Sequence, residues 1–278
     1  MEKNIKAIDS MISENRLGEK VGIMKLEKGA EYRYSGLAQL AERGTTLDQL
    51  LQEMDKVDIE RAVLRMSLSG WDDHDDDWAL QAVALHHDRF IACAMVDPRE
   101  GFKEVRKIEM LVKEHGVKAV RVAPWTTGKA PNDKIYYPIY AKCVELGIPV
   151  TMTIGIPVNR VPFGEIQRPI HLDEVCWYFP DLTIIASHGA EPWIEELIAL
   201  MLKWPNLYFM TSGIAPEYYR PALIQYMNTR GVDKVLYASA YPGLTLDRCI
   251  NGIMQLPLRD HVWAKFLREN ALRVFNWD

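Results

Sequence analysis

The residues best suited to chemistry follow short apolar runs rich in β-branched side chains. The run over residues 183–186 ends in Ser187, His188 and Gly189. An imidazole has an unperturbed pKa of about 6.5, so His188 is suited to acid or base catalysis near neutral pH. The alternative is a core histidine that donates to a backbone carbonyl. Its place between serine and glycine at the end of a predicted strand favours the catalytic interpretation.

Two arginines share this kind of position. Arg121 lies within the apolar run 119–123, and Arg65 ends another predicted strand. Burying an arginine alone is costly, so each side chain must face a partner or a wet cavity. One interpretation is a guanidinium fork that binds a substrate carboxylate. The other is a structural ion pair, with Asp97 or Asp9 as the partner of Arg121, and both remain open at this point.

The run 70–77 holds five aspartates and one histidine. It lacks the glycine and the distal glutamate of an EF-hand calcium loop. Acidic residues before a helix complement its positive end, so we expect the start of a solvated helix here rather than a metal site.

Strands and helices alternate along the chain. Apolar runs predict strands over residues 5–12, 61–67, 90–96, 118–123, 149–153, 183–187, 207–211 and 235–238. Amphipathic segments between them predict helices, among them 47–54, 102–115 and 218–228. Eight such repeats in 278 residues predict an α/β fold, a single-domain (β/α)8 TIM barrel over residues 1–278 with an inserted loop region at about 14–44. A doubly wound open sheet is the alternative, although no G-x-G-x-x-G follows the first strand.

In a barrel, the carboxyl ends of the strands build the site. That rule brings the following residues to one rim: Met11, Ser13, Arg65, Ser67, Asp97, Arg121, Trp125, Thr153, His188, Thr211, Ser212, Ser239, Ala240 and Tyr241.

Composition excludes some partners. The net charge is −5 with acids and bases interspersed, so we expect no nucleic-acid partner. No apolar run is long enough to span a membrane, and the first residues lack the apolar core of a signal peptide. The four cysteines are scattered without a C-x-x-C pair, which favours a reducing, cytoplasmic location.

Several motifs together resemble one known family. These are Ile8-Asp9, Ser187-His188-Gly189, Trp193, the segment 238–242 and the terminal N-A-x-R-x-F pattern at 270–275. The chain resembles the amidohydrolase-related family of TIM-barrel hydrolases and decarboxylases, which includes aminocarboxymuconate-semialdehyde decarboxylase and 2-pyrone-4,6-dicarboxylate lactonase. The likeness runs over nearly the whole length and is more specific for the family than for a substrate.

The resemblance implies a metal site whose ligands are mostly replaced. The family's histidine pair after strand one falls on Met11 and Ser13, and its strand-five histidine falls on Thr153. His188 is kept, whereas the strand-eight aspartate falls on Ala240. We therefore expect no tight zinc or manganese site and no cofactor. Either the catalytic base has moved, with His188 as its replacement, or Ala240 is an introduced Asp→Ala change.

These residues favour a metal-independent hydrolase acting on a small carboxylated or lactone-like substrate. In that hypothesis His188 activates water or protonates the leaving group, and Arg121 and Arg65 bind carboxylate. The hydroxyls of Thr153, Ser13 and Ser239 donate to an oxyanion, and Trp125 and Tyr241 form pocket walls. The alternatives are a decarboxylase on the same scaffold and a ligand-binding barrel without catalysis. By analogy with such barrels we expect a homo-oligomer.

Overall fold

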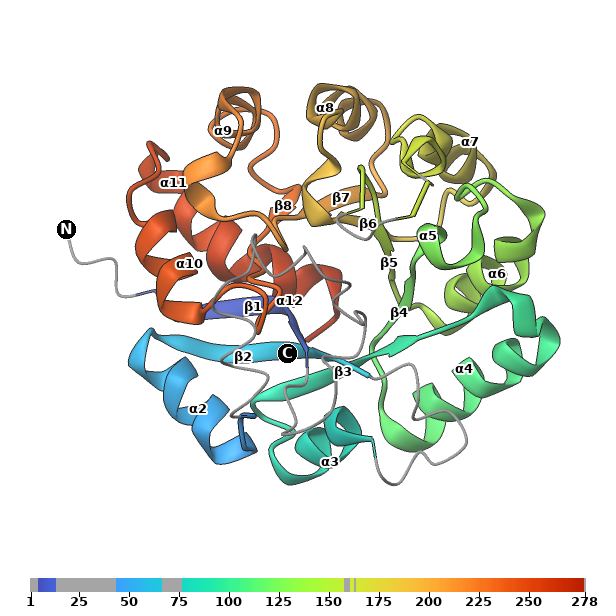
Figure 1. The fold of residues 1–278 in the computed structure, drawn as a ribbon, viewed down its shortest axis with the longest axis horizontal. Helices are drawn as coiled ribbons and strands as arrows, with labels where there is room; N and C mark the ends of the chain where they lie inside the picture. Colours follow the sequence, from blue (N-terminus) through green and yellow to red (C-terminus); the bar gives the residue numbers. More distant parts are fainter. Residues whose placement is uncertain (1–4, 14–43, 67–76, 158–160, 163, 278) are drawn as a thin grey trace.

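The computed structural model describes residues 5–13, 44–66, 77–157, 161–162 and 164–277, and Figure 1 shows a ring of helices around a central barrel of strands. The strands, all parallel and paired in chain order, are β1 (Ala7–Ser13), β2 (Ile59–Arg65), β3 (Phe90–Met95), β4 (Ala119–Val122), β5 (Val150–Thr153), β6 (Ile184–Ser187), β7 (Leu207–Met210) and β8 (Val235–Leu236). The Ser10 N–H donates to the Tyr237 carbonyl at 2.9 Å, which joins the last strand to the first. The predicted (β/α)8 barrel is confirmed, and the open-sheet alternative is wrong.

The helices cover the outside of the barrel. They are α2 (Leu47–Lys56), α3 (Trp78–Leu85), α4 (Phe102–His115), α5 (Pro124–Thr127), α6 (Tyr137–Leu146), α7 (His171–Tyr178), α8 (Ile194–Lys203), α9 (Pro221–Met227), α10 (Leu246–Ile253), α11 (Asp260–Ala264) and α12 (Asn270–Val274). A short helical turn, η6 (Pro216–Tyr218), precedes α9.

Local sequence fixes where several helices begin and end. Thr46 caps α2 in a reciprocal capping box with Gln49. Helix α4 ends at Gly116, whose φ of 66° is the left-handed conformation that glycine adopts without strain. Asp77 caps α3 by accepting from two backbone N–H groups, so a helix does start at the end of the acidic run, but Asp77 is buried and not solvated as expected. The rest of that run lies outside the described residues, as does nearly all of the expected inserted loop region.

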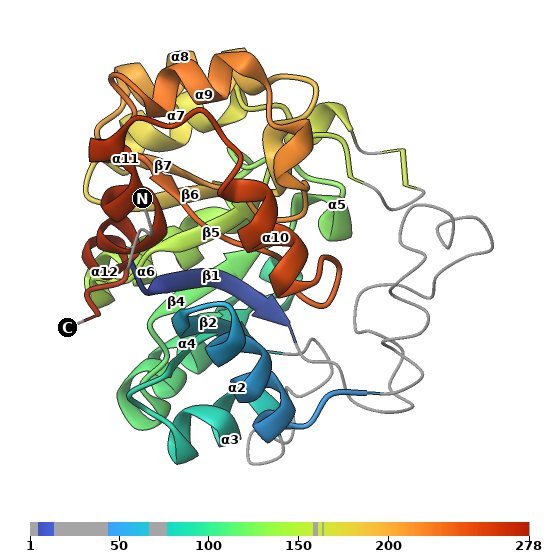
Figure 2. The same cartoon turned by 90° about the vertical axis from the view of Figure 1, so that its left-hand side faces the viewer.

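One end of the barrel is closed by apolar packing. Inward-facing side chains from seven strands form a layer with residues of α12 and with Trp277, and they are Ile8, Val63, Ile91, Ala119, Ile185, Met210 and Leu236. Figure 2 shows α12 and the C-terminus at the end opposite the tips of the strand arrows. Because the amino ends of the strands are filled in this way, polar chemistry is confined to their carboxyl ends.

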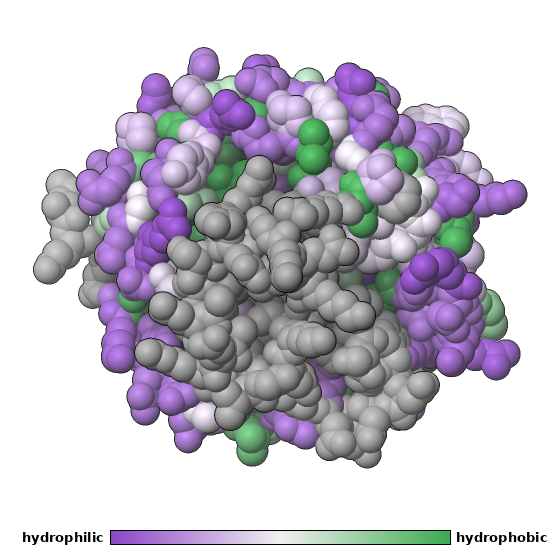
Figure 3. All heavy atoms as spheres, viewed as in Figure 1, coloured by the Kyte–Doolittle hydropathy of each residue, from purple (hydrophilic) through white to green (hydrophobic). Residues whose placement is uncertain are grey.

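On the face drawn in Figure 3, hydrophilic residues cover most of the coloured surface, and apolar residues lie there in small groups. In the described ranges, no helix combines the length and apolarity needed to cross a bilayer. All four cysteines are buried thiols outside any disulfide, which agrees with the scattered pattern seen in the sequence.

Candidate active site

The two arginines point into the barrel because each lies two residues after an inward-facing core residue of the same strand. Side chains along a strand alternate between its two faces, so residues two apart share one face. Arg121 therefore follows inward-facing Ala119, and Arg65 follows inward-facing Val63. Both side chains are buried, with 2% and 7% of their surface exposed. Both arginines lie near the carboxyl ends of their strands, where the barrel rule placed them.

Arg121 is held by neutral acceptors from the next two strands. Its Nη1 donates to Ser187 Oγ at 3.1 Å, and its Nη2 donates to Thr153 Oγ1 at 2.7 Å. The same Nη2 lies 2.7 Å from His188 Nε2. A guanidinium has no acceptor, so the imidazole must accept here and its own proton must sit on Nδ1. Thr153, Ser187 and His188 thus converge on one cation.

No acidic side chain in the described residues pairs with this cation. Burial lowers the pKa of Arg121 from 12.5 to about 10, and the Cys93 thiol opposes that shift. The group is therefore still positively charged at neutral pH, and its Nε has no hydrogen-bond partner among the described residues. The structural alternative, an ion pair with Asp97 or Asp9, is wrong.

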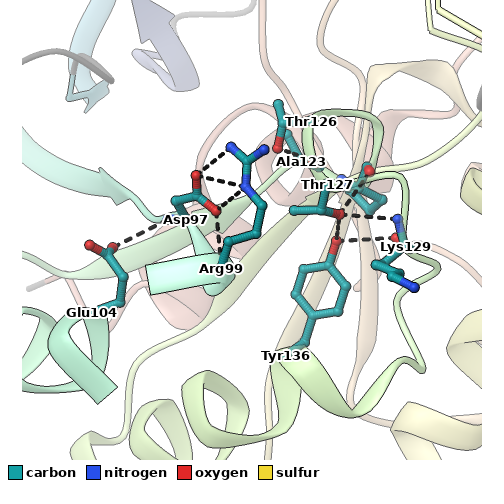
Figure 4. Close-up of polar contacts among 9 residues, drawn as sticks. Asp97, Arg99, Glu104, Ala123, Thr126, Thr127, Lys129 and Tyr136 are labelled. Carbon is teal, nitrogen blue, oxygen red and sulfur yellow. Dashed lines mark hydrogen bonds and ion pairs between the residues drawn. The ribbon is translucent and has the colours of Figure 1, made fainter. Parts of the chain in front are cut away.

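Asp97 is committed elsewhere. Figure 4 shows its carboxylate against the guanidinium of Arg99, with contacts of 2.8 Å and 3.0 Å from Arg99 Nε and one of 2.5 Å from Nη2. The Asp97 backbone N–H donates to Glu104 in turn. This rim carboxylate therefore stabilises the loop after β3 and leaves the barrel interior without a counter-ion from that strand.

The segment that follows β7 positions the His188 side chain. The residue has a left-handed φ of 65°, and its backbone N–H donates to Ser212 Oγ at 3.2 Å. Ser212 Oγ also lies 3.5 Å from His188 Nδ1, and a side chain on Gly213 would place its Cβ only 2.7 Å from that nitrogen. Ser212 and Gly213 therefore fix the ring on the side opposite Arg121.

The environment keeps His188 neutral. Burial first, and then the charges of Arg121 and Arg65, lower its pKa from 6.5 to about 3. A neutral imidazole at this pKa is a weak base and carries no acidic proton to donate at pH 7. The catalytic role proposed from the sequence is untested, but in this state the ring serves first as an acceptor for a guanidinium.

Arg65, the last residue of β2, likewise donates to a hydroxyl of a neighbouring strand. Its Nε donates to Ser13 Oγ at 2.9 Å, and its Nη1 lies 3.5 Å from the Met95 sulfur. Ser13 therefore accepts from an arginine, as Thr153 does. Three of the predicted site residues, Ser13, Thr153 and His188, are thus hydrogen-bonded to the two predicted arginines.

Four more of the predicted residues, Met11, Ser239, Ala240 and Tyr241, lie on the seam between β1 and β8, whereas Ser67 lies outside the described residues. Asp9 Oδ1 accepts from the N–H groups of Met11 and Ser239, both at 3.0 Å. Ser239 Oγ accepts from the Tyr241 N–H, so its hydroxyl is engaged in the barrel wall. The pKa of Asp9 is raised from 3.8 to about 6 by burial, against hydrogen bonds from the two neighbours. Ala240, with a φ of 61°, donates its N–H to the Met11 carbonyl.

Two aromatic residues predicted as pocket walls differ in their surroundings. Tyr241 is 1% exposed and its hydroxyl lies 2.8 Å from Thr45 Oγ1, so it packs in the core beside the seam. Trp125, on α5, is half-buried and its backbone N–H donates to Gln167. Their roles as pocket walls stay predictions.

Sequence reasoning left two contributors, Ser187 and Gly213, out of the site. Ser187 lies two residues after inward-facing Ile185 on the same strand, so its inward direction could have been predicted. Ser212 was placed at the rim, but its contact with His188, 24 residues earlier in the chain, was not predicted, because nothing in the local sequence after β7 indicates it.

The residues at the family's metal-ligand positions do not fit a metal ion. In the described ranges, no three side chains of histidine, cysteine, aspartate or glutamate are grouped so that they could hold one. Of the positions named above, Thr153, Ser13 and His188 each face a guanidinium N–H. Methionine, alanine and hydroxyls are poor substitutes for the histidine and carboxylate ligands that zinc and manganese take in proteins.

An eight-stranded α/β barrel with its buried polar groups at the carboxyl ends of the strands defines a class of TIM-barrel proteins. Within that class the chain belongs to the amidohydrolase family, whose model "Amidohydrolase" matches residues 27–277. No curated protein gives a significant match.

Solved structures share the fold over nearly the whole chain. An uncharacterised TIM-barrel protein, Bb4693 from Bordetella bronchiseptica, is 26% identical with a TM-score of 0.79 and coverage of 98% of this chain and 99% of its own. The 5-carboxyvanillate decarboxylase of Novosphingobium aromaticivorans, with bound manganese, is 18% identical with a TM-score of 0.75, over 99% and 98% of the two chains. The 2,6-dihydroxybenzoate decarboxylase from Rhizobium is 16% identical with a TM-score of 0.74, over 98% and 99%.

Proposed function

We propose that this protein is an enzyme that binds a small carboxylate at the carboxyl ends of its strands and cleaves a carbon–carbon bond, releasing carbon dioxide. One observation carries the proposal: the Arg121 guanidinium is buried with three neutral acceptors and no acid among the described residues. A negatively charged oxygen is a stronger acceptor for a guanidinium than a hydroxyl or an imidazole. An anionic ligand would therefore compete well for this cation.

Decarboxylation suits the site better than the hydrolysis favoured by the sequence. Hydrolysis needs a base that activates water, and the pKa of His188 near 3 makes it a poor one. Ala240 stands where the resemblance places the family's aspartate, so that base is missing as well. Decarboxylation needs no activated water. Several solved structures of similar fold are decarboxylases, which supports decarboxylation as the proposed reaction.

The chemistry required of the site is electrostatic. As the bond to the carboxyl carbon breaks, its electron pair moves into a conjugated group of the substrate and ends on an oxygen. Arg121 would face that oxygen, because binding only the departing carboxylate would stabilise the ground state. A proton then replaces the lost carboxyl group. An anion in the site would offset the two guanidinium charges and raise the pKa of His188, which would let the imidazole carry this proton.

The test is a turnover screen with chelator-treated protein on small hydroxy- and oxo-carboxylates. We expect carbon dioxide release from at least one of them, with one solvent deuteron in the product when the reaction runs in D2O. Arg121→Met should lower turnover by at least ~100-fold, on the order of the loss of one transition-state donor. Arg248→Met is the matched control, because that exposed arginine pairs with Glu217 on the outside of the barrel.

Two results would count against the proposal. Incorporation of labelled oxygen from water without carbon dioxide release would indicate hydrolysis, the second candidate. That candidate is favoured by the convergence of a guanidinium and the Thr153 hydroxyl, an arrangement that suits a tetrahedral oxyanion. Equal turnover in wild type and Arg121→Met would remove Arg121 from the site altogether.

A further inference from the structure

We infer that the Nη2 end of the Arg121 guanidinium takes the place of the metal ion in this barrel, so that a built-in cation replaces a bound one. This inference deepens the proposed function and rests on it only for the identity of the ligand as a carboxylate. The misfit between the donor set and a metal, described above, is its starting point.

The geometry around Nη2 is that of a small coordination site. Two residues at the family's ligand positions, Thr153 from the end of β5 and His188 from the end of β6, both lie 2.7 Å from this nitrogen. Nη2 carries two hydrogens, and each acceptor takes one. The lone pair of His188 Nε2, which a metal would need, is therefore already used by the arginine.

The second arginine provides an independent observation of the same kind. Ser13, at another of the family's ligand positions, accepts from Arg65 Nε at 2.9 Å. Three of the five positions thus point an acceptor at a guanidinium. The remaining two, Met11 and Ala240, are joined to each other through a backbone hydrogen bond between β1 and the segment after β8.

The positive charge of the guanidinium groups opposes the binding of a metal ion at this place. Arg65 and Arg121 both lower the pKa of His188, and no acid among the described residues contributes to the pKa of His188 or of Arg121. A divalent cation at Nε2 of His188 would have to approach the charge of the Arg121 guanidinium, which has no acidic partner among the described residues. The site is therefore built to attract anions and to repel metal ions.

A pair of variants tests this exclusion directly. Thr153→His/Ala240→Asp would give His188 two further ligands, enough for a three-residue metal site. The second variant adds Arg121→Met to the same two changes. Each protein is stripped with chelator, and Mn²⁺ binding is measured by equilibrium dialysis with elemental analysis. Circular dichroism confirms that both are folded.

We expect Mn²⁺ to bind at least ten-fold more tightly when Arg121 is absent. Wild-type protein should hold less than a tenth of an equivalent of Mn²⁺. Its affinity for the probe 2,6-dihydroxybenzoate should change less than two-fold when EDTA or Mn²⁺ is added. Stoichiometric Mn²⁺ on the wild type, or equal Mn²⁺ affinity with and without Arg121, would overturn the inference. Failure of the probe to bind while the Mn²⁺ results hold would count against the proposed function alone.

Discussion

Replacing His188 by asparagine tests the electrostatics of the site through the pH dependence of stability. Asparagine tolerates the left-handed backbone at this position, where φ is 65°, and its side-chain oxygen can accept from Arg121 in place of Nε2. The change removes the titrating group and leaves the other titrating groups in place. Any pH-dependent difference between the two proteins therefore comes from this one imidazole.

The sign and size follow from the pKa of His188, which is 6.5 in the unfolded chain and about 3 in the fold. A lowered pKa gives stability that is present above pH 6.5 and is lost as the pH falls, because the unfolded chain then binds a proton that the fold refuses. Each pH unit below 6.5 costs about 1.4 kcal/mol, so two units cost about 3 kcal/mol. Because part of the side chain reaches solvent, we expect about 2 kcal/mol between pH 7 and 4.5.

The assay is urea unfolding of both proteins at several pH values from 7 to 4.5. The stability of wild type relative to His188→Asn should fall by about 2 kcal/mol over this range. In an Arg121→Met background the same difference should shrink without vanishing, because burial is the larger cause of the shift and the guanidinium the second. Parallel curves for wild type and His188→Asn would refute the claim that the fold holds a neutral imidazole against two cations.

Three further outcomes follow from other described residues. Asp9→Asn should have the opposite pH dependence, because the pKa of Asp9 is raised from 3.8 to about 6 and its contribution to the free energy of unfolding is lost as the pH rises through that window. Urea unfolding at pH 4 and 7 should show wild type losing about 3 kcal/mol relative to the variant. Gly213→Ala should destabilise the fold by about 1–3 kcal/mol in thermal unfolding, since its Cβ would lie 2.7 Å from His188 Nδ1; unchanged stability would mean that the ring is free to move. The four cysteines are buried with raised pKa values, so a thiol reagent should label them only after unfolding, and rapid labelling of the native protein would contradict their burial.

The order of elements was predictable because each β–α repeat carries its own local pattern. Strand ends were less so: β8 covers only Val235–Leu236, although the apolar run continues to Ala238. The helix predicted over 218–228 is split, with η6 before it and α9 starting at Pro221. Proline favours the first turn of a helix, so Pro221 could have indicated this start from the sequence.

The site was predictable only in part. The rim positions of His188, Arg121 and Thr153 followed from strand ends, because a barrel gathers those ends at one face. Their mutual contacts could not be predicted in this way. Thr153 and His188 lie 32 and 67 positions after Arg121 in the chain, and they meet it only because of the register of β4, β5 and β6. For the same reason the ion pair considered for Arg121 could not be dismissed until Asp9 was found in the β1–β8 seam.

A crystal structure of the metal-soaked protein with a bound carboxylate would test the central claim most directly. Crystals grown at pH 7 would be soaked in Mn²⁺ with 2,6-dihydroxybenzoate, and anomalous data would be collected at the manganese edge. We predict Arg121 Nη2 within hydrogen-bond distance of the ligand or of Thr153 and His188, and no anomalous peak beside His188 Nε2. A manganese ion bound to that nitrogen, with the guanidinium turned away, would contradict the account.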